Sequence, residues 1–430
     1  MGSVNSRIGW MFALLAVGTA LGQSFEDRAR QALDQVLAGN CDAFYAQFSP
    51  EAKKAITLET YKSQVGRLLA ALGKPLRLDP PQTQHTGNPT TIVIPVHWAA
   101  ATLNFIVSWN AAGEIQGTSF RPPQSPAPPY TTPSYSRPDS FSAREVTVGS
   151  DEWKLPGTLT IPKDKGPWPA VVLVHGSGPN DRDETVGGVR VFRDLAEGLS
   201  SRGVAVLRYD KRTKVHPHEC AADPNFTMTQ ETVDDAVRAA ALLRTEADID
   251  PRRIYVLGHS QGGYMMPRIM QADTRLAGVI VMAGNVRPLE ELIVAQTEYL
   301  FGLKGQLTDT ERAQLDAIRK DPWKVLPGVT AKYRADLKDY QPVPLAAASP
   351  EPMLILQGER DYQVTMKDFA LWKAGLAHKP NVTFHSYPAL NHLFVAGQGQ
   401  SRPEEYEKPA HVAPEAIADI AGWIDGGPSN

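Results

Sequence analysis

The sequence predicts an α/β fold for most of its 430 residues, built on a mostly parallel, doubly wound sheet. From Phe141 onward, short apolar runs alternate with stretches of helical periodicity, as in parallel strands joined by helices. The run over 170–174 is apolar at every position, which is typical of a strand buried on both faces. Before Phe141 helical segments come first and strand-like segments follow, so a separate small α+β domain is expected there.

The composition suits a globular protein with room for two or three domains. Hydrophobic residues make up 42% of the chain, enough to bury a large core. The formal net charge is −3, and this near balance indicates neither nucleic acid nor an acidic membrane surface as a partner. The two cysteines, Cys41 and Cys220, fall in different predicted domains. The sequence leaves open whether they are bonded, and we favour two separate thiols over a disulfide that joins the domains.

Residues 1–22 have the features of a cleavable secretory signal peptide. A single basic residue, Arg7, precedes an apolar core over 8–17, and Ala20 and Gly22 are small residues that suit a cleavage site after Gly22. The apolar core is too short to cross a bilayer well. We therefore expect a secreted, periplasmic or cell-envelope protein without stable membrane insertion once the signal is removed.

The N-terminal domain is predicted over residues 24–120. Segments with helical periodicity lie at 25–37, 42–48 and 57–72, and strand-like segments follow at 91–97, 101–109 and 115–120. This order resembles small α+β domains with a cystatin-like or nuclear-transport-factor-like shape. We find no catalytic constellation in it, and interpret His85 and His97 as surface and strand residues.

A Pro-rich linker is predicted over residues 121–140, with seven prolines among Ser, Thr and Tyr between Arg121 and Pro138. Such a composition favours an extended, semi-rigid segment and marks a domain boundary. The second domain then covers residues 141–427. Its strands are expected at 144–148, 158–161, 170–174, 204–208, 253–257, 278–283, 353–357 and 382–387, the first two antiparallel. Its helices are expected at 192–200, 229–243, 264–270, 366–376 and 414–424.

One segment of the second domain departs from this alternation. Residues from about 287 to 349 are rich in helical pattern, are broken by prolines and lie between two successive strands. A long interruption of this kind predicts an inserted helical cap over the site, with a surface excursion as the alternative.

The most informative motif is Gly-His-Ser-Gln-Gly at 258–262, which fits G-x-S-x-G between a predicted strand and a predicted helix. In such a tight turn the residues two before and two after the serine must lack side chains, and here they are Gly258 and Gly262. The turn lifts the Oγ of Ser260 clear of the backbone. It also directs the backbone N–H of Gln261 toward a developing oxyanion.

A serine hydroxyl needs a neighbouring base, commonly a histidine held by a carboxylate, and in this strand–turn–helix setting the chain order is Ser, acid, His. Asp361 follows the predicted strand at 353–357, at the carboxyl edge of the sheet where sites gather. Glu359 is a competitor for the acid. We prefer Asp361 because Gly358 first lets the chain turn.

The base is expected to be His392, which lies on the loop between the last predicted strand and the terminal helix. His385 lies inside that strand, and His411 lies in a Pro-containing approach to the helix. The positions of these two histidines suit a catalytic base less well.

The loop at 174–179, Val-His-Gly-Ser-Gly-Pro, should complete the oxyanion hole. Its small residues allow a backbone N–H, that of Ser177, to approach the substrate oxygen. His175 could serve as a base, but we favour a role in packing the loop. The charged segments at 180–184 and 207–212 are interpreted as an ion-pair network between adjacent loops, with substrate contact by an arginine as the alternative.

On these residues, the chain from about Phe141 to Asp425 resembles the α/β-hydrolase superfamily. Within it, the chain is similar to secreted bacterial carboxylesterases and acyl hydrolases with a His-Gly-Ser-Gly-Pro loop, an Arg-Tyr-Asp-Lys-Arg segment and a Gly-His-Ser-Gln-Gly elbow, preceded by a small α+β domain of unknown function. The resemblance implies a triad and two backbone N–H donors. These residues are Ser260, Asp361 and His392 for the triad, and Ser177 and Gln261 for the donors.

The predicted function is that of a serine carboxylesterase, which hydrolyses small-molecule esters, with short acyl chains expected, through an acyl-enzyme. No cofactor and no metal are expected; the His and Cys residues at 216–220 lack a matching partner pair. Alternatives on the same fold are a serine peptidase or aminopeptidase, an acyl-CoA thioesterase and a non-catalytic binding protein. The oligomeric state stays open, with dimerisation through the N-terminal domain or the cap as one option.

Overall fold

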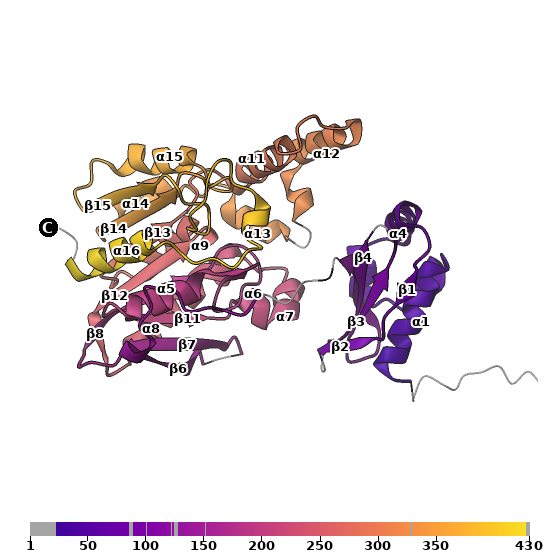
Figure 1. Cartoon of the computed structure of the whole chain (residues 1–430), viewed down its shortest axis with the longest axis horizontal. Coiled ribbons are helices and arrows are strands. Elements are labelled where there is room, and N and C mark those ends of the chain that lie inside the picture. The colour runs from indigo at the N-terminus through magenta and orange to yellow at the C-terminus, as the bar shows by residue number, and fades with distance from the viewer. Residues whose placement is uncertain are drawn as a thin grey trace, which may run out of the picture. The chain divides into compact units, whose positions relative to one another are not determined.

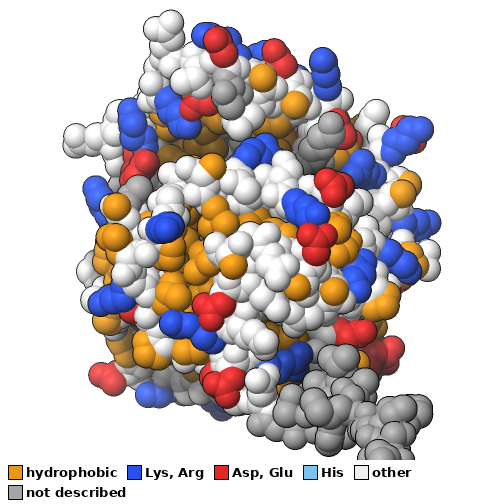
Figure 2. Space-filling model, turned by 90° about the vertical axis from the view of Figure 1, so that its right-hand side faces the viewer, with side chains coloured by type: hydrophobic (Ala, Val, Ile, Leu, Met, Phe, Trp, Pro, Cys, Tyr) orange, Lys and Arg blue, Asp and Glu red, His pale blue; other side chains and the backbone are white. Residues whose placement is uncertain are grey.

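The computed structural model divides after Pro126 into two compact units (Figure 1). The structure describes residues 23–85, 89–99, 101–121, 123, 128–150, 152–326 and 329–426. The signal peptide predicted over 1–22 lies outside these residues. Within the described ranges no helix combines the length and the apolar character that a membrane span requires. On the face shown in Figure 2, Lys and Arg side chains are interspersed with Asp and Glu side chains, consistent with the small net charge.

The first unit consists of helices followed by an antiparallel sheet. The helices are α1 (Phe25–Leu37), α2 (Cys41–Ala46), α3 (Pro50–Ala55) and α4 (Leu58–Leu72). The strands are β1 (Arg77–Leu78), β2 (Gln82–His85), β3 (Thr90–His97), β4 (Thr102–Trp109) and β5 (Ile115–Arg121). Within the described residues the sheet runs β1-β3-β4-β5, and β2 also pairs with β3. Ser24, Ser49 and Thr57 each accept a backbone N–H at the start of a helix, which explains where α1, α3 and α4 begin.

The core of this first unit is aromatic. Phe44 of α2 packs between Phe105 of β4 and Tyr61 of α4, with ring centroids 6.3 and 5.7 Å away. Cys41 is a buried free thiol in the same cluster. Cys220 of the second unit is also buried and free.

The second unit is built on a mixed, mostly parallel sheet. In the described part of the chain eight strands run in the order β15-β14-β13-β12-β8-β11-β7-β6. They are β6 (Phe141–Val148), β7 (Leu155–Pro162), β8 (Trp168–Val174), β11 (Ala205–Tyr209), β12 (Ile249–His259), β13 (Gly278–Met282), β14 (Met353–Gly358) and β15 (Val382–Tyr387). Strand β7 is antiparallel to both of its neighbours, and the other pairs are parallel. The α/β fold predicted from the sequence is therefore confirmed.

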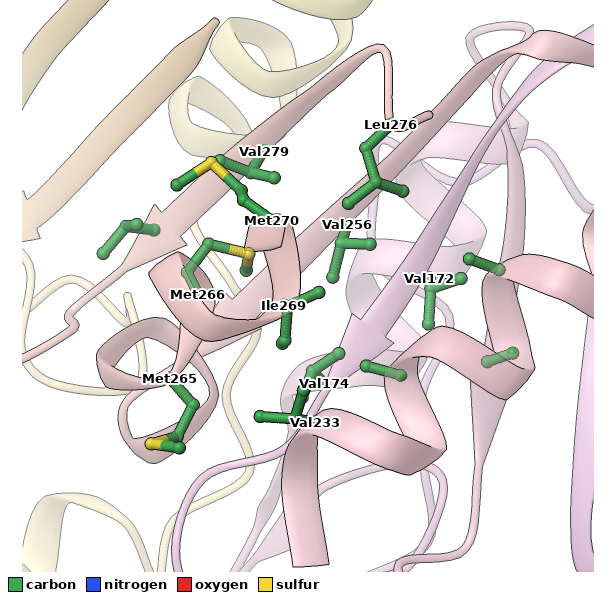
Figure 3. Packing of buried hydrophobic residues seen from close by; sticks show 14 of the residues in the cluster. Val172, Val174, Val233, Val256, Met265, Met266, Ile269, Met270, Leu276 and Val279 are labelled. Atoms are coloured by element: carbon green, nitrogen blue, oxygen red, sulfur yellow. The ribbon is translucent and has the colours of Figure 1, made fainter. Parts of the chain in front are cut away.

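Helices cover both faces of this sheet. One face packs against α5 (Val191–Ser200) and α16 (Pro414–Gly426), and the other packs against α8 (Asp234–Leu243), α10 (Met266–Ala272) and α15 (Met366–Leu376). Side chains of a strand alternate between the faces: in β8, Val171 and Leu173 join the first cluster and Val172 and Val174 the second. Figure 3 shows Ile269 of α10 facing strand residues of the second cluster. This double burial explains the continuous apolar runs.

Short elements connect the larger ones. They are η1 (Pro138–Ser140), the ribbon of β9 (Thr185–Val186) and β10 (Val189–Arg190), α6 (Arg212–Val215), α7 (Pro217–Ala222), the π-helical turn η2 (Thr229–Val233), α9 (Gln261–Tyr264) and η4 (Pro403–Glu405). Residues 128–140, within the predicted linker, pack on the second unit. There the Tyr130 hydroxyl donates to Asp194 (2.9 Å), and the Arg137 N–H donates to Ser201 Oγ (2.7 Å).

The insertion between β13 and β14 is helical. It contains α11 (Leu289–Gly302), α12 (Asp309–Lys320), η3 (Pro322–Val325), α13 (Ala331–Leu337) and α14 (Pro342–Ala348). Two of its tyrosines donate to backbone oxygens of segments that follow the strands: Tyr340 OH donates to Tyr264 O of α9 (2.7 Å), and Tyr299 OH donates to Ser401 O (2.7 Å). Gln296 also donates its side-chain amide to Gln363 O at 3.1 Å. These contacts place the insertion against α9, which follows β12, and against the loops that follow β14 and β15.

Candidate active site

Ser260 lies in a sharp turn between β12 and α9. Its backbone has φ 52° and ψ −113°, a left-handed conformation that residues other than glycine rarely adopt. A Cβ on Gly258 would lie 2.3 Å from the carbonyl carbon of Gly262, and a Cβ on Gly262 would lie 2.2 Å from the oxygen of Val174. Both positions therefore require glycine, and the strained turn presents the Ser260 side chain at the carboxyl end of β12.

Asp361 and His392 form a buried pair. His392 Nδ1 donates to Asp361 Oδ2 at 2.6 Å, and each residue is 4% exposed. The other oxygen, Oδ1, accepts the backbone N–H groups of Gln363 (2.7 Å) and Val364 (2.9 Å), and the Gln357 amide donates to Oδ2 at 3.1 Å. These donors fix the carboxylate, and the carboxylate in turn orients the imidazole so that its Nε2 is left for chemistry.

The competing acid and histidines are engaged elsewhere. Glu359 is exposed and accepts the Ser386 hydroxyl at 2.8 Å. His385 pairs with Asp419 at 3.2 Å, and His411 pairs with Asp194 at 3.0 Å. His175 is buried, donates to Asp181 O at 3.0 Å and packs on Phe192 and Tyr209. Burial lowers the pKa of His175 to about 4, so it packs the loop as a neutral ring.

The serine and the Asp361–His392 pair are connected through the neighbouring His259. The rings of His259 and His392 are 4.8 Å apart, and His259 Nε2 donates to the backbone oxygen of His392 at 3.0 Å. Within the described residues Ser260 Oγ makes no hydrogen bond to His392. Catalytic contacts of this type commonly tighten only when a substrate binds.

The loop after β8 passes beside the serine. A Cβ on Gly176 would lie 3.2 Å from Ser260 Cβ, so the backbone at Gly176 passes close to Ser260. Among the described residues no hydrogen-bond acceptor engages the backbone N–H of Ser177 or of Gln261. The Gln261 side chain is held away from the site by a 3.0 Å bond from its Nε2 to Thr232 Oγ1.

Glu184 is a component of the site that sequence reasoning missed. Its Oε1 accepts the Gly176 N–H at 2.7 Å, and its Oε2 lies 3.0 Å from His259 Nδ1 in an ion pair. Burial is the largest single effect on the pKa of Glu184 and would raise it, but the charge of His259, the hydrogen bond to His259 and the Gly176 N–H together outweigh burial, and the pKa is lowered. Burial likewise opposes protonation of His259, yet Glu184 raises the pKa of His259. Glu184 adopts φ 47° and is buried, whereas its charged neighbours at 181–183 are partly exposed.

Those neighbours do form the predicted network between adjacent loops. Arg182 binds Asp210 at 3.0 Å and Glu145 at 2.6 Å, and Arg208 pairs with Asp183. Across the described part of the chain no cluster of three or more His, Cys, Asp or Glu side chains is arranged to hold a metal ion.

Similarity to known proteins agrees with this fold. Residues 171–408 match the alpha/beta hydrolase family. Esterase EstD of Thermotoga maritima is 40% identical over 327 residues, which cover 75% of this chain and 76% of EstD. The uncharacterized protein YfhR of Salmonella typhimurium is 24% identical over 242 residues, which cover 55% of this chain and 68% of YfhR.

Among solved structures, an esterase of Pyrococcus furiosus superposes with a TM-score of 0.45 at 16% identity, covering 70% of this chain and 97% of that one. Est1E of Butyrivibrio proteoclasticus gives a TM-score of 0.44 at 17% identity, with 66% and 99% covered. The family match spans more than half of the 430 residues, and the relative at 40% identity covers three quarters of the chain. The chain therefore belongs to the alpha/beta hydrolase family.

Proposed function

We propose that this protein is a serine carboxylesterase with the triad Ser260, His392 and Asp361. The observation that carries the proposal is the buried 2.6 Å contact between His392 and Asp361, on loops adjoining the strained serine turn. The 40% identical relative is itself named an esterase, which supports ester hydrolysis over other reactions of the fold.

In the proposed mechanism Ser260 Oγ attacks the ester carbonyl while His392 Nε2 takes its proton. Asp361 accepts the Nδ1 proton of His392 in a hydrogen bond and stabilises the imidazolium that forms. The oxyanion receives the N–H groups of Ser177 and Gln261. His392 then protonates the leaving alcohol and activates the water that releases the acyl group.

We propose short acyl chains as the preferred substrates. The helical insertion supports this because its tyrosines contact segments that follow the strands leading to the proposed site, Tyr340 at Tyr264 and Tyr299 at Ser401. On this proposal, an insertion fastened at these points would limit the length of acyl chain that fits beside the serine.

The test is hydrolysis of p-nitrophenyl esters from acetate to palmitate by the wild type and by Ser260→Ala. We expect activity that peaks at short chains, and a loss in kcat on the order of 10⁴–10⁶ in the variant. A Ser260→Ala protein that remains folded and active would refute the triad. If the wild type cleaves none of these esters, it should be assayed with peptide anilides and with acyl-CoA. If a fluorophosphonate does not label Ser260 of the wild type, the result would favour a non-catalytic binding protein.

A further inference from the structure

A buried lysine lies behind the proposed oxyanion loop. Lys211 follows β11 and is 1% exposed, although a buried charge is unfavourable unless it is paired and hydrogen-bonded. Its Nζ donates to the backbone oxygen of Gly176 at 2.7 Å and pairs with Glu231 Oε1 at 2.8 Å. The proposed triad makes no use of this ammonium group.

The carbonyl that Lys211 binds belongs to the peptide group of the proposed oxyanion donor. The oxygen of Gly176 and the N–H of Ser177 lie in one planar peptide unit, so fixing the oxygen also fixes the direction of the N–H. A cation on the carbonyl oxygen also polarises the amide and makes its N–H a stronger donor, because hydrogen bonds in a low-dielectric interior strengthen one another. Asn180 Nδ2 donates to the same oxygen at 3.1 Å.

Gly176 is thus held between two buried charges of opposite sign. Glu184 accepts its N–H at 2.7 Å, and Lys211 donates to its carbonyl oxygen at 2.7 Å. The loop is further tied to Lys211 by the backbone, because the Lys211 N–H donates to Asn180 O at 3.0 Å. The N–H and the carbonyl oxygen of Gly176 are therefore both fixed by buried side chains, next to Ser260.

The helical insertion contributes to the same chain of contacts. Tyr333 of α13 donates its hydroxyl to Glu231 Oε2 at 2.6 Å, so both carboxylate oxygens of Glu231 are engaged. Burial, and then the charge of Glu231, raise the pKa of Tyr333 well above its ordinary value, which keeps the proton on the phenol. Glu231 lies in the π-helical turn η2 beside Thr232, which holds the Gln261 side chain.

We propose that Lys211 is a positioning residue of the oxyanion hole, which aligns and polarises the Gly176–Ser177 peptide and is itself held in place by Glu231 and Tyr333. The inference rests on the proposed function, because it assigns a role to a residue behind the proposed oxyanion donor. Lys211 does not touch the substrate, so it acts through the peptide alone.

The decisive variant is Lys211→Met, with Arg212→Met as its matched control. Arg212 is also a buried cation, 3% exposed, but it pairs with Asp235 through a 2.9 Å bond from its Nε. For each folded protein we would measure kcat and KM on p-nitrophenyl butyrate, Ki for a trifluoromethyl ketone and the thermal midpoint. Ser260 Oγ adds to the ketone carbonyl while His392 takes the hydroxyl proton, and the carbonyl oxygen becomes a hemiketal oxyanion, so the affinity for the ketone reports the strength of the oxyanion hole.

Removing a whole oxyanion donor costs about 10²–10³ in kcat, so weakening one should cost on the order of 10-fold. We expect Lys211→Met to lose this factor in kcat with KM within about twofold, and to raise Ki for the ketone by the same factor. Arg212→Met should lower the thermal midpoint and leave both kcat and Ki near the wild type. Tyr333→Phe, which keeps the lysine, should show a smaller loss in kcat with a parallel rise in Ki.

A folded Lys211→Met protein with wild-type kcat and Ki would overturn the inference, and so would a loss of kcat without a change in Ki. If Lys211→Met does not fold, Tyr333→Phe decides by the same two measurements. A wild type without Ser260-dependent ester hydrolysis would overturn the proposed function, and the inference with it. Wild-type activity combined with unaffected variants would overturn the inference alone.

Discussion

Glu184 and His259 form a buried ion pair, with Oε2 and Nδ1 3.0 Å apart, directly behind the serine turn. His259 precedes Ser260 in the chain and donates a hydrogen bond from Nε2–H to His392 O, while Glu184 accepts the N–H of Gly176. One pair of charges therefore ties together the loops that carry Ser260, His392 and Gly176, which hold the proposed nucleophile, base and oxyanion donor.

This pair predicts a stability that depends on pH. The lowered pKa of Glu184 gives a contribution that is complete above its ordinary value of 4.5 and is lost as the pH falls through the folded-state value. The raised pKa of His259 gives a contribution that is complete below its ordinary value of 6.5 and is lost as the pH rises through the folded-state value. The pair therefore stabilises most between pH 4.5 and 6.5.

We expect Glu184→Gln to lower the free energy of unfolding by about 3 kcal/mol in that window, because it leaves a buried charge without its partner. The difference from the wild type should shrink at both higher and lower pH. Urea unfolding from pH 4 to 9 measures it, with the exposed Glu145→Gln as control. A difference that is constant with pH would contradict the assignment of the two charges.

The acid of the proposed triad is tested by comparing Asp361→Asn with Glu359→Gln. Asparagine at 361 retains the shape of the side chain but no longer holds the Nδ1–H tautomer of His392, so we expect kcat to fall about 10⁴-fold. Glu359 instead binds Ser386 at an exposed position, and its variant should stay within about twofold of the wild type. Steady-state kinetics on a short-chain p-nitrophenyl ester separate the two. Equal losses of kcat in the two variants would contradict the assignment of Asp361 as the acid.

The turn at Ser260 was predictable because its signal is local. Gly258 and Gly262 flank the serine within five residues, and the steric reason for them can be read from the motif itself. Asp361 and His392 could also be selected from the sequence, since each follows a recognisable strand. In contrast, Glu184 and Lys211 were both interpreted as parts of an ion-pair network between two adjacent loops. Their inward contacts with Gly176 depend on how two loops meet in three dimensions, which no spacing in the sequence encodes.

Strand limits illustrate the same difference. Strand β12 extends over Ile249–His259, beyond the apolar run predicted at 253–257, because its early part pairs with Trp168 through an irregular register. The four residues of strand β2 are all polar and all exposed, so β2 has no alternation of apolar and polar residues. Nothing in the sequence predicted this strand. Its partner β3 determines its conformation, so pairing outweighs local preference.

The two elbow glycines should not tolerate alanine. Gly258→Ala and Gly262→Ala each place a Cβ within 2.4 Å of backbone atoms, so the strand or the turn must move and the serine with it. We expect either variant to lose at least about 10²-fold in kcat, because small displacements of a nucleophile have effects of this size. Gly422→Ala in α16 is the matched control. Its Cβ meets nothing within 4 Å, and it should raise stability by up to about 1 kcal/mol without changing kcat.

The buried carboxylate of Asp368 is expected to contribute strongly to the folding stability of the second unit. It is fully buried in α15, accepts the N–H groups of Val286 and Arg287 at 3.0 Å each, and pairs with the Arg287 guanidinium at 2.6 Å. These contacts hold the chain where the helical insertion begins. Asp368→Ala leaves a buried guanidinium and two N–H groups without their acceptor, so we expect a loss of about 3–5 kcal/mol in the free energy of unfolding.

The control for Asp368 is Asp316→Ala, which removes an exposed carboxylate that pairs with Arg319 three residues away in α12. Exposed pairs of this spacing contribute about 0.5 kcal/mol or less, so this variant should unfold almost as the wild type does. Urea unfolding followed by tryptophan fluorescence measures both proteins. If Asp368→Ala were no less stable than Asp316→Ala, the start of the insertion would not depend on the Arg287 pair, and its anchorage would lie in the tyrosine contacts at Tyr264 and Ser401.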